Sequence, residues 1–394
     1  MIDWVQQWVQ IPTSSYDTDG LAKMADSVEQ AFLPLNATVE RIDLQPNQII
    51  NSLGMVEKKS LGQALRFRKR PEAPKKIFLG IHTDVVYGKA PVRDELLVTA
   101  KLPIIDGKLY ASGAADAKGG LAILIMALEV LEASPYAKDI GWEVLINPDE
   151  ELGSPGSLPL LIEAAGRNHI GLLFEPALSN GDLVGARKGS GNFTLVVHGK
   201  AAHAGRDAHL GRNAIHALAR FIVDLEKFAQ AHPDILINVG KIEGGGPVNR
   251  IPDLAIGRLN IRIVDAAQLK AVENYLQELQ QEISATYGVT LELYGEFRSL
   301  PKPLSDAQVS LLNSIKSCGE KLGMQLDWQS SGGVSDGNKL AAAGLVNVDT
   351  LGAVGGNIHS SEEYLIVKSL EERASLVALL LMQIGSGEIT LPLK

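Results

Sequence analysis

One segment in the first half of the chain carries the most information about its architecture: Trp142-Glu143-Val144-Leu145-Ile146-Asn147-Pro148-Asp149-Glu150-Glu151-Leu152-Gly153-Ser154. The apolar run Val144–Ile146 predicts a buried strand, and Pro148 ends it. Glu150 and Glu151 then stand side by side at the carboxyl end of this strand. In an open α/β sheet, ligands bind at that end of the strands.

The two adjacent carboxylates repel each other, so their adjacency requires an explanation. One explanation is a division of roles, in which one carboxylate binds a metal ion and the other takes a proton from water. The alternative is a solvated acidic turn, because runs of charge usually face water. The rest of the sequence favours the first interpretation.

Length and composition limit the class of protein. A chain of 394 residues predicts two domains. Its net charge of -9 argues against nucleic acid or an anionic membrane as the main partner. A single cysteine, Cys318, excludes an internal disulfide framework and fits a reducing compartment, so we expect a cytoplasmic protein.

The N-terminal residues do not resemble a targeting segment. Met1 to Val9 lack the basic start and the unbroken apolar core of a signal peptide. Trp4, Val5 and Trp8 fall on one helical face, which predicts a short packed helix. No apolar run reaches the about 20 residues that a membrane-spanning helix needs, so we expect no membrane partner.

Strand-like and helix-like segments alternate along the chain, which predicts an α/β fold. The predicted strands are 61–67, 77–81, 144–146, 170–174 and 346–350. The predicted helices are 121–131, 158–165, 307–322 and 370–384. These segments predict a mixed, mostly parallel sheet flanked by helices.

The middle of the chain has a different character. Apolar and polar residues alternate from Phe193 to Val197, which predicts a half-exposed strand in a separate sheet. Long helices at about 213–231 and 267–287 each lead into strand-like residues. We therefore predict a discontinuous catalytic domain and an inserted α+β lid and dimerisation domain, with the limits 1–187 and 299–394 for the first and 188–298 for the second.

Metal-type ligands follow several predicted strands or precede a helix: His82 and Asp84, Asp116, Glu150 and Glu151, Glu175, and His359 in a late glycine-rich loop. The ends of parallel strands converge at one edge of a sheet, so these side chains can form one cluster. Imidazole and carboxylate ligands without cysteine suit zinc or cobalt in a hydrolytic site. Asp84 could also accept the second ring N–H of His82.

Each residue also has an ordinary structural explanation. His82 could be a hydrogen-bonded structural histidine, and Asp116 could be a helix N-cap. Glu175 could belong to a surface turn before Pro176. Their joint placement at strand ends favours a site over these separate explanations.

Seven motifs together resemble one family: His82-Thr83-Asp84, Gly113-Ala114-Ala115-Asp116-Ala117-Lys118-Gly119-Gly120, Asp149-Glu150-Glu151-Leu152-Gly153-Ser154, Phe174-Glu175-Pro176, Gly199-Lys200-Ala201-Ala202-His203-Ala204-Gly205, Gly332-Gly333-Val334-Ser335-Asp336 and His359-Ser360. In this order, and over essentially the whole length, the chain resembles the zinc carboxypeptidase and deacylase family. That family includes bacterial glutamate carboxypeptidase, succinyl-diaminopimelate desuccinylase, acetylornithine deacetylase and aminoacylase.

The resemblance implies a site for two divalent metal ions, zinc or alternatively cobalt or manganese. In this family pattern Asp116 bridges the two ions. His82 and Glu175 complete the ligands of one ion, and Glu151 and His359 complete those of the other.

The resemblance also implies roles in catalysis. Glu150 matches the general base that later acts as the acid, and Asp84 matches the residue that orients His82. The peptide bond between Asp116 and Ala117 is expected to be cis. His203 is expected to reach the active site of the partner subunit and to stabilise the oxyanion, whereas without the family it would be a turn histidine.

Two further positions match substrate-binding residues. Arg262 matches an arginine that holds the substrate carboxylate, although by itself it could be an exposed charge at a strand end. Asn249 matches a substrate-binding asparagine. The backbone N–H groups of Gly332 and Gly333 also suit a carboxylate.

We therefore expect a homodimeric hydrolase that cleaves an amide bond in a small N-acyl amino acid or a carboxylate-bearing short peptide. Glu175, rather than Asp, resembles the carboxypeptidase and deacylase branch, and the residues around His203 look most like glutamate carboxypeptidase. A dipeptidase or aminopeptidase is the first alternative, and a catalytically silent metal-binding protein is the second. Carboxylate-only catalysis, as in a glycosidase, would leave His82 and His359 unexplained.

Overall fold

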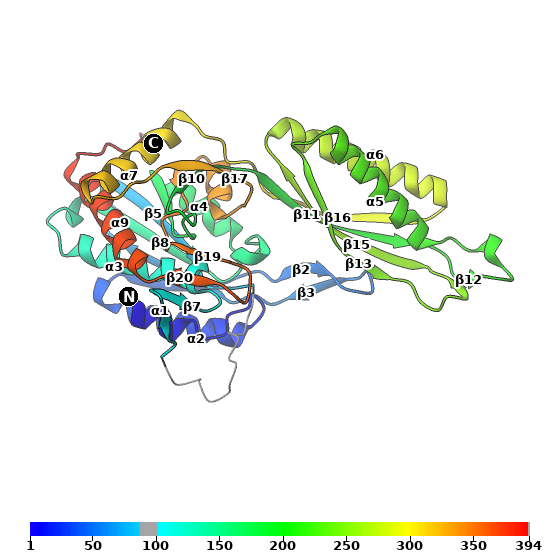
Figure 1. Ribbon diagram of the computed structural model, residues 1–394, viewed down its shortest axis with the longest axis horizontal. Coiled ribbons are helices and arrows are strands. Elements are labelled where there is room, and N and C mark those ends of the chain that lie inside the picture. Colours follow the sequence, from blue (N-terminus) through cyan, green and yellow to red (C-terminus); the bar gives the residue numbers. More distant parts are fainter. Residues whose placement is uncertain (87–100, 393–394) are drawn as a thin grey trace.

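A six-stranded sheet forms the centre of the larger lobe in the computed structural model, which describes residues 1–86 and 101–392 (Figure 1). In spatial order its strands are β1 (Thr38–Asp43), β4 (Gln63–Lys69), β8 (Ile140–Asn147), β5 (Lys75–His82), β9 (Ile170–Leu173) and β18 (Asn347–Val348). β4 is antiparallel to both of its neighbours, whereas β8, β5, β9 and β18 are parallel. The predicted mixed, mostly parallel sheet is confirmed.

Helices cover both faces of this sheet, which explains its nearly continuous apolar strands. Alternate residues of β5 show the two faces: Ile77 and Leu79 belong to one core cluster and Phe78 to another. The first face is covered by α1 (Ile2–Trp8), α2 (Thr18–Phe32), α3 (Gly120–Glu132), α7 (Asp306–Lys321) and α9 (Lys368–Ser386). The second is covered by α4 (Leu158–Arg167) and α8 (Asp336–Ala342).

Short strands complete the larger lobe. They are the hairpin β2 (Asn47–Ile50) and β3 (Val56–Lys59), the pair β10 (Leu183–Arg187) and β17 (Trp328–Ser331), and a small sheet of β19 (Gly355–Gly356), β20 (Tyr364–Ile366), β7 (Lys108–Tyr110) and β6 (Ile104–Ile105). Helix α2 and strands β1 to β3 were not predicted. Asp17 marked the start of α2, since its side chain accepts the N–H of Gly20 as an N-cap.

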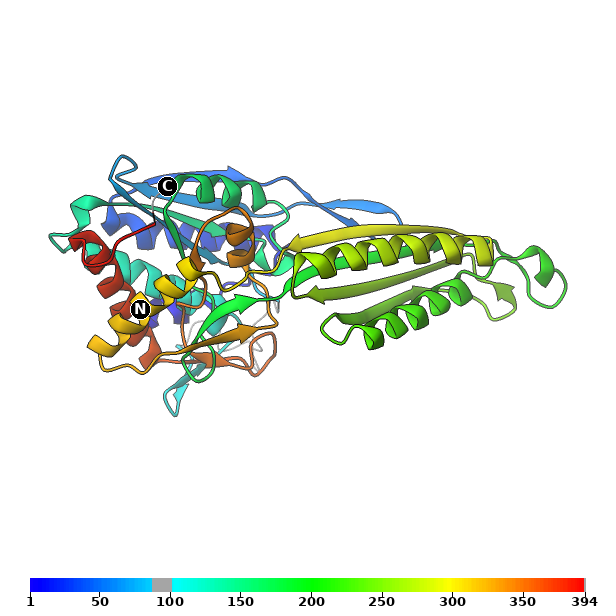
Figure 2. The same cartoon turned by 90° about the horizontal axis from the view of Figure 1, so that it is seen from above.

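A second, elongated lobe extends away from the first (Figure 1), and we call it the arm (residues 189–299). Its antiparallel sheet has the order β13 (Leu236–Gly244), β15 (Leu254–Ile263), β11 (Gly189–His198) and β16 (Thr290–Ser299). α5 (Ala214–Ala231) and α6 (Ala266–Tyr287) lie along one face (Figure 2) and form a separate hydrophobic core with it. The limits of the arm lie next to the predicted limits of the inserted segment.

The prediction that the Phe193–Val197 strand is half-exposed is wrong at one position. Phe193 faces the arm's helices as expected, but Val196, on the opposite face, is also fully buried. The β2–β3 hairpin extends from the larger lobe along the arm (Figure 1), and its Ile50 packs against Val196 and Ile256. The covering residue lies far away in sequence, so local alternation did not reveal it.

Within the described residues, no helix combines the length and the apolarity needed to cross a bilayer.

Candidate active site

Three neighbouring parallel strands bring the first candidate residues to one edge of the central sheet. His82 is the last residue of β5, Glu150 and Glu151 begin a short helical turn just after β8, and Glu175 closely follows β9. β5 lies between β8 and β9, so the three strand ends are adjacent. This arrangement follows the general rule for ligand sites in α/β sheets.

Asp116 enters the same space from the turn before α3. The peptide bond between Asp116 and Ala117 is cis, as predicted. Gly119, and not Asp116, is the N-cap of α3, and no side chain caps that helix. Asp116 is therefore free of the capping role that was its alternative explanation.

The carboxylate of Asp116 faces two histidines, one with each oxygen. Its Oδ1 lies 3.1 Å from Nε2 of His82, and its Oδ2 lies 3.2 Å from Nε2 of His359. The Oε2 atom of Glu175 is 3.4 Å from Nε2 of His82, and Oε2 of Glu151 is 3.2 Å from Nε2 of His359. The five predicted ligands therefore form two groups that share Asp116.

Glu150 lies beside the first group. One ligand-type atom from each of Glu150, His82 and Glu175 falls within 4.8 Å of the others. Burial, together with the negative charge of Glu175, raises the pKa of Glu150 well above its usual value. A carboxylate with a raised pKa is suited to accept and return a proton near neutral pH.

The electrostatics of the cluster fit divalent cations. Burial raises the pKa of Glu151 and of Glu175, because ionised carboxylates lose hydration there. Hydrogen bonds to Asp116 and Glu151 raise the pKa of His359 to about 11, so the cluster favours positive charge strongly. Two ions bound by these imidazoles and carboxylates would supply that charge with ligands typical of zinc.

The contacts of Asp84 differ in detail from the predicted ones. Nδ1 of His82 lies 2.9 Å from the backbone carbonyl of Asp84 and 3.4 Å from its carboxylate Oδ1. The carboxylate instead accepts the N–H groups of Glu150 and Glu151, each at 3.1 Å, and the hydroxyl of Ser15 at 2.7 Å. Asp84 thus fixes the tautomer of His82 mainly through its backbone and holds the Glu150–Glu151 turn through its side chain.

A polar cleft of about 790 Å³ opens from this cluster toward the arm. Arg262 of β15 lines it together with Asn192, Asn238 and Asn260 of the same sheet. Nε of Arg262 donates to the side-chain oxygen of Asn260 at 3.2 Å, and Nη1 donates to the carbonyl of Gly332. The Nη2 donors of Arg262 have no partner among the described residues, so they are free for a ligand.

The predicted glycine contribution to substrate binding is only partly supported. Gly333 lines the cleft, but its N–H donates to Oγ of Ser331 at 3.1 Å. Its carbonyl accepts from Arg187 at 3.2 Å. The N–H of Gly333 is therefore engaged, and its role as a carboxylate donor stays a prediction.

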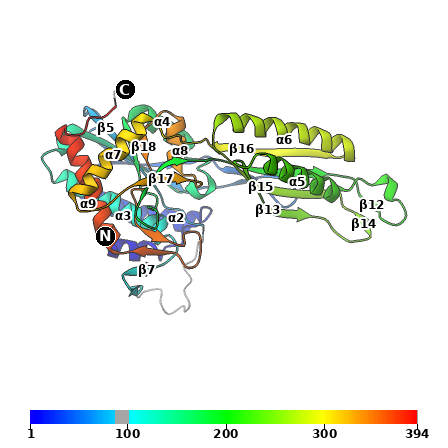
Figure 3. The same cartoon turned by 45° about the horizontal axis from the view of Figure 1, so that its top comes forward.

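His203 and Asn249 are not brought into this cleft. His203 ends β12 (Ala202–His203), which pairs with β14 (Arg250–Ile251) at the far end of the arm (Figure 3). Asn249 lies beside it, and its carbonyl accepts the N–H of Ala204 at 2.9 Å. Both predicted functional residues are therefore remote from the metal-type ligands of their own subunit.

Two buried ion pairs, whose basic members Arg187 and Lys339 line the cleft, were not predicted. Arg187 forms a two-point contact with Asp349, at 2.8 and 2.9 Å. Nζ of Lys339 lies 2.8 Å from Oδ1 of Asp336. Asp336 belongs to the quoted glycine motif, but nothing in the local sequence showed that it would pair with a buried lysine three residues later.

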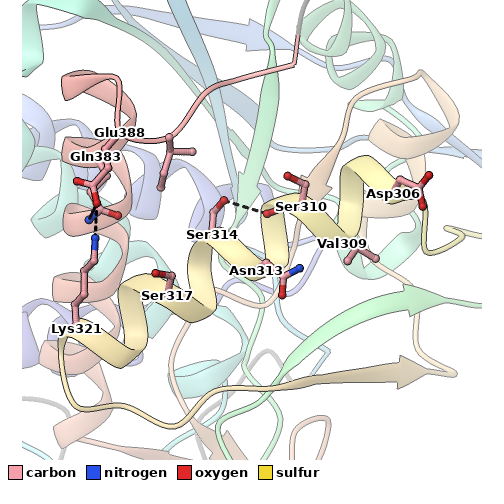
Figure 4. Close-up of a pocket in the computed structure, with 10 residues that line it drawn as sticks. Asp306, Val309, Ser310, Asn313, Ser314, Ser317, Lys321, Gln383 and Glu388 are labelled. Atoms are coloured by element: carbon pink, nitrogen blue, oxygen red, sulfur yellow. Dashed lines mark hydrogen bonds and ion pairs between the residues drawn. The ribbon is translucent and has the colours of Figure 1, made fainter.

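A second hollow, of about 590 Å³, lies between α7 and α9 (Figure 4). Ser310, Asn313, Ser314 and Ser317 line one side of it. Lys321 and Glu388 form an ion pair at one end. None of the predicted site residues is among the described residues that line this hollow, so it is separate from the metal-type cluster.

Comparisons with known proteins found a matching family model, sequence relatives and similar solved structures. A family model described as Peptidase family M20/M25/M40 matches residues 78–383. Carboxypeptidase G2 of Pseudomonas sp. (strain RS-16) is 27% identical over 400 residues, covering 98% of this chain and 90% of the relative. A succinyl-diaminopimelate desuccinylase of Hahella chejuensis is 29% identical over 325 residues, covering 78% of this chain and 82% of the relative. The crystal structure of an M20 family metallo-carboxypeptidase from Sulfolobus solfataricus superposes with a TM-score of 0.74 at 17% identity, covering 97% of this chain and 98% of the other.

Proposed function

Since this chain belongs to peptidase family M20/M25/M40 and is therefore a metallopeptidase or amidohydrolase, we propose that it cleaves the amide bond of a small N-acyl amino acid or short peptide with a free α-carboxylate. One observation carries the proposal: the cleft that holds the two ligand groups also holds Arg262, whose guanidinium has no carboxylate partner among the described residues. A substrate carboxylate would complete its hydrogen bonds.

The same cleft argues against an aminopeptidase. Its described acidic lining residues are Asp116, Glu150, Glu151 and Glu175, all of which belong to the metal-type cluster. None is left to bind a substrate ammonium group. A carboxypeptidase or deacylase is therefore the better proposal. The names of the two relatives, a carboxypeptidase and a desuccinylase, support this choice.

In the proposed reaction the protein's own groups move the proton and hold the substrate. Glu150 takes a proton from the attacking water and returns it to the leaving amine. Arg262 holds the α-carboxylate, and Asp84 keeps the Glu150–Glu151 turn in place. Two divalent ions, which we propose to be zinc, would lower the pKa of water and polarise the amide carbonyl.

A substrate panel tests the proposal. N-acyl amino acids and dipeptides ending in glutamate are incubated with the enzyme and zinc, cobalt or manganese, and the released amine is measured. Each substrate is paired with its α-amide. We expect hydrolysis of the free acids and little of the amides, because an amide lacks the negative charge and the second acceptor oxygen that Arg262 would bind in a carboxylate. Preference for substrates with a free amino group and a blocked carboxyl would contradict the proposal.

Arg262→Ala should weaken the free acids selectively. The lost charge-assisted contact corresponds to roughly 1.5–3 kcal/mol, or about 10- to 150-fold in kcat/KM, whereas the amides should change little. Arg258→Ala is the matched control, since Arg258 lies on the same strand but pairs with Glu243 outside the cleft lining. An equal loss on acids and amides would remove Arg262 from carboxylate binding.

We further propose that the protein works as a homodimer in which His203 serves the partner's site. Nδ1 of His203 accepts the N–H groups of Gly205 and Arg206, at 3.2 and 3.1 Å. The neutral ring then carries its hydrogen on Nε2, which can donate to an oxyanion. β13 is an edge strand with exposed Leu236 and Ile242, and pairing with a second copy would cover it.

Complementation tests this shared site. His203→Ala and Glu150→Gln proteins are each expected to be nearly inactive, but their heterodimer contains one intact site if His203 acts in the partner. A random mixture should regain up to about a quarter of wild-type activity, since about half the dimers are mixed and each has one good site of two. Flat activity, with subunit exchange demonstrated by tagged copies, would contradict action in the partner.

A further inference from the structure

One buried carboxylate near the cluster has no role in the reaction described above. Glu363 is only 3% exposed. Its Oε2 accepts the N–H of Gly113 at 2.8 Å, and its Oε1 accepts those of Ala115 and Asp116 at 2.9 and 3.0 Å. Among the described residues, these three backbone N–H groups are the hydrogen-bond donors to the Glu363 side chain. The side chain of Glu363 therefore binds the loop that carries Asp116.

This arrangement constrains the position of Asp116. Backbone N–H groups that converge on one point form a concavity for an anion, and here the chain's own carboxylate fills it. Three hydrogen bonds hold this loop against the carboxyl group of Glu363. Since the N–H of Asp116 itself is one of the three donors, the backbone from which its carboxylate projects toward His82 and His359 is fixed.

Glu363 also stabilises the turn that carries His359. The two residues are separated by a tight loop in which Oγ of Ser360 donates to the carbonyl of Asn357 at 2.6 Å, and the N–H of Glu363 donates to the carbonyl of Ser360 at 3.4 Å. The backbone carbonyl of Glu363 in turn accepts the N–H of Ala111 at 3.1 Å. His359 is half-exposed and has a φ of 60°, so its ring depends on this loop for its place.

We propose that Glu363 is a positioning residue for metal binding, which holds Asp116 and His359 at the separation that the shared site needs. The proposal rests on the metal site proposed above. Asp84 has the same relation to the Glu150–Glu151 turn, where its carboxylate also accepts successive backbone N–H groups. Two buried carboxylates that are not ligands thus anchor the loops that supply Asp116, Glu151 and His359.

Zinc affinity measured by competition with a chromophoric chelator tests this role. Glu363→Gln keeps the shape of the side chain but places an NH₂ group against at least one backbone donor, and we expect the affinity to fall about 10- to 100-fold. Glu363→Asp keeps the charge with a shorter reach, and we expect a smaller fall. Glu362→Gln is the matched control, because Glu362 is the adjacent, exposed residue and should bind zinc like wild type.

Thermal unfolding of the metal-free proteins separates positioning from general stability. If Glu363 positions the ligands, the zinc affinity of Glu363→Gln should fall by more than its loss of metal-free stability can explain. Glu363→Asp should then keep part of the zinc affinity that Glu363→Gln loses. Wild-type affinity in Glu363→Gln, or in Glu363→Asp should the glutamine variant not fold, would overturn the inference. Failure of the wild type itself to bind zinc would overturn the proposed metal site, and this inference with it.

Discussion

Replacing Glu150 with glutamine is expected to lower kcat by about 10²–10⁴-fold, the range for general acid–base catalysis, while the metal content stays that of wild type. We expect the upper part of the range, because Glu150 is proposed to act twice, as base and then as acid. Glutamine has the same shape but can neither take the proton nor return it.

Stability should not account for this loss. Burial raises the pKa of Glu150, so its ionised form is disfavoured in the folded protein. A neutral glutamine removes that penalty, and the metal-free variant should unfold at the same temperature as wild type or at a higher one. Thermal unfolding of both metal-free proteins checks this.

Glu151→Gln is the matched variant for the adjacent position. Oε2 of Glu151 lies 3.2 Å from Nε2 of His359, within the second ligand group, so this change should lower the metal content as well as the rate. Elemental analysis of both variants distinguishes the two roles. Glu150 also lies within ligand distance of His82 and Glu175. Loss of metal in Glu150→Gln, with metal retained in Glu151→Gln, would show that the two roles are reversed.

Removal of metal is expected to abolish turnover, and zinc, cobalt or manganese should restore it. The ligands that motivate this are His82, Asp116, Glu151, Glu175 and His359. Magnesium should restore much less, because it prefers oxygen ligands and two of the five are imidazoles. Full turnover by protein shown to be metal-free would contradict the prediction.

Metal binding should also stabilise the fold in a pH-dependent way. At a zinc concentration 100 times its Kd, the free energy of unfolding should rise by about 2.7 kcal/mol. The folded-state pKa values of Glu151, Glu175 and His359 are all raised, so the metal-free fold loses stability as pH rises from each group's unfolded pKa, 4.5 for the carboxyl groups and 6.5 for the imidazole, through its folded pKa. Zinc binds the deprotonated groups, so its stabilisation should grow as pH rises from about 5 and should continue to grow above neutrality, which calorimetry can measure.

Several features could be predicted because they depend on neighbours in the sequence. The apolar run Val144–Ile146 lies within β8, which is buried at every position, as a strand covered by helices on both faces must be. The ligand types other than His359 were recognisable because each ends or follows a strand or opens a helix, whereas His359 lies in a glycine-rich loop. Their convergence followed from the topology, since the parallel strands β5, β8 and β9 end at one edge.

Other features depend on residues that are far apart in the chain. Asp84 is two residues from His82, yet its carboxylate binds the turn after β8, 66 residues away. Glu363 binds a loop about 250 residues earlier, as its bond to Gly113 shows. Val196 is buried by a hairpin from the other lobe.

Local pattern thus specified many of the strands and helices, though not α2 or β1 to β3, and it showed which side chains can bind a metal, because periodicity and residue chemistry act over a few neighbours. The orientation of Asp116 between two histidines, the anchoring of the ligand loops and the distance of His203 from its own cluster were set by tertiary packing. Hydrogen bonds from distant backbone groups and burial by distant side chains decide those positions, and no short segment contains both partners.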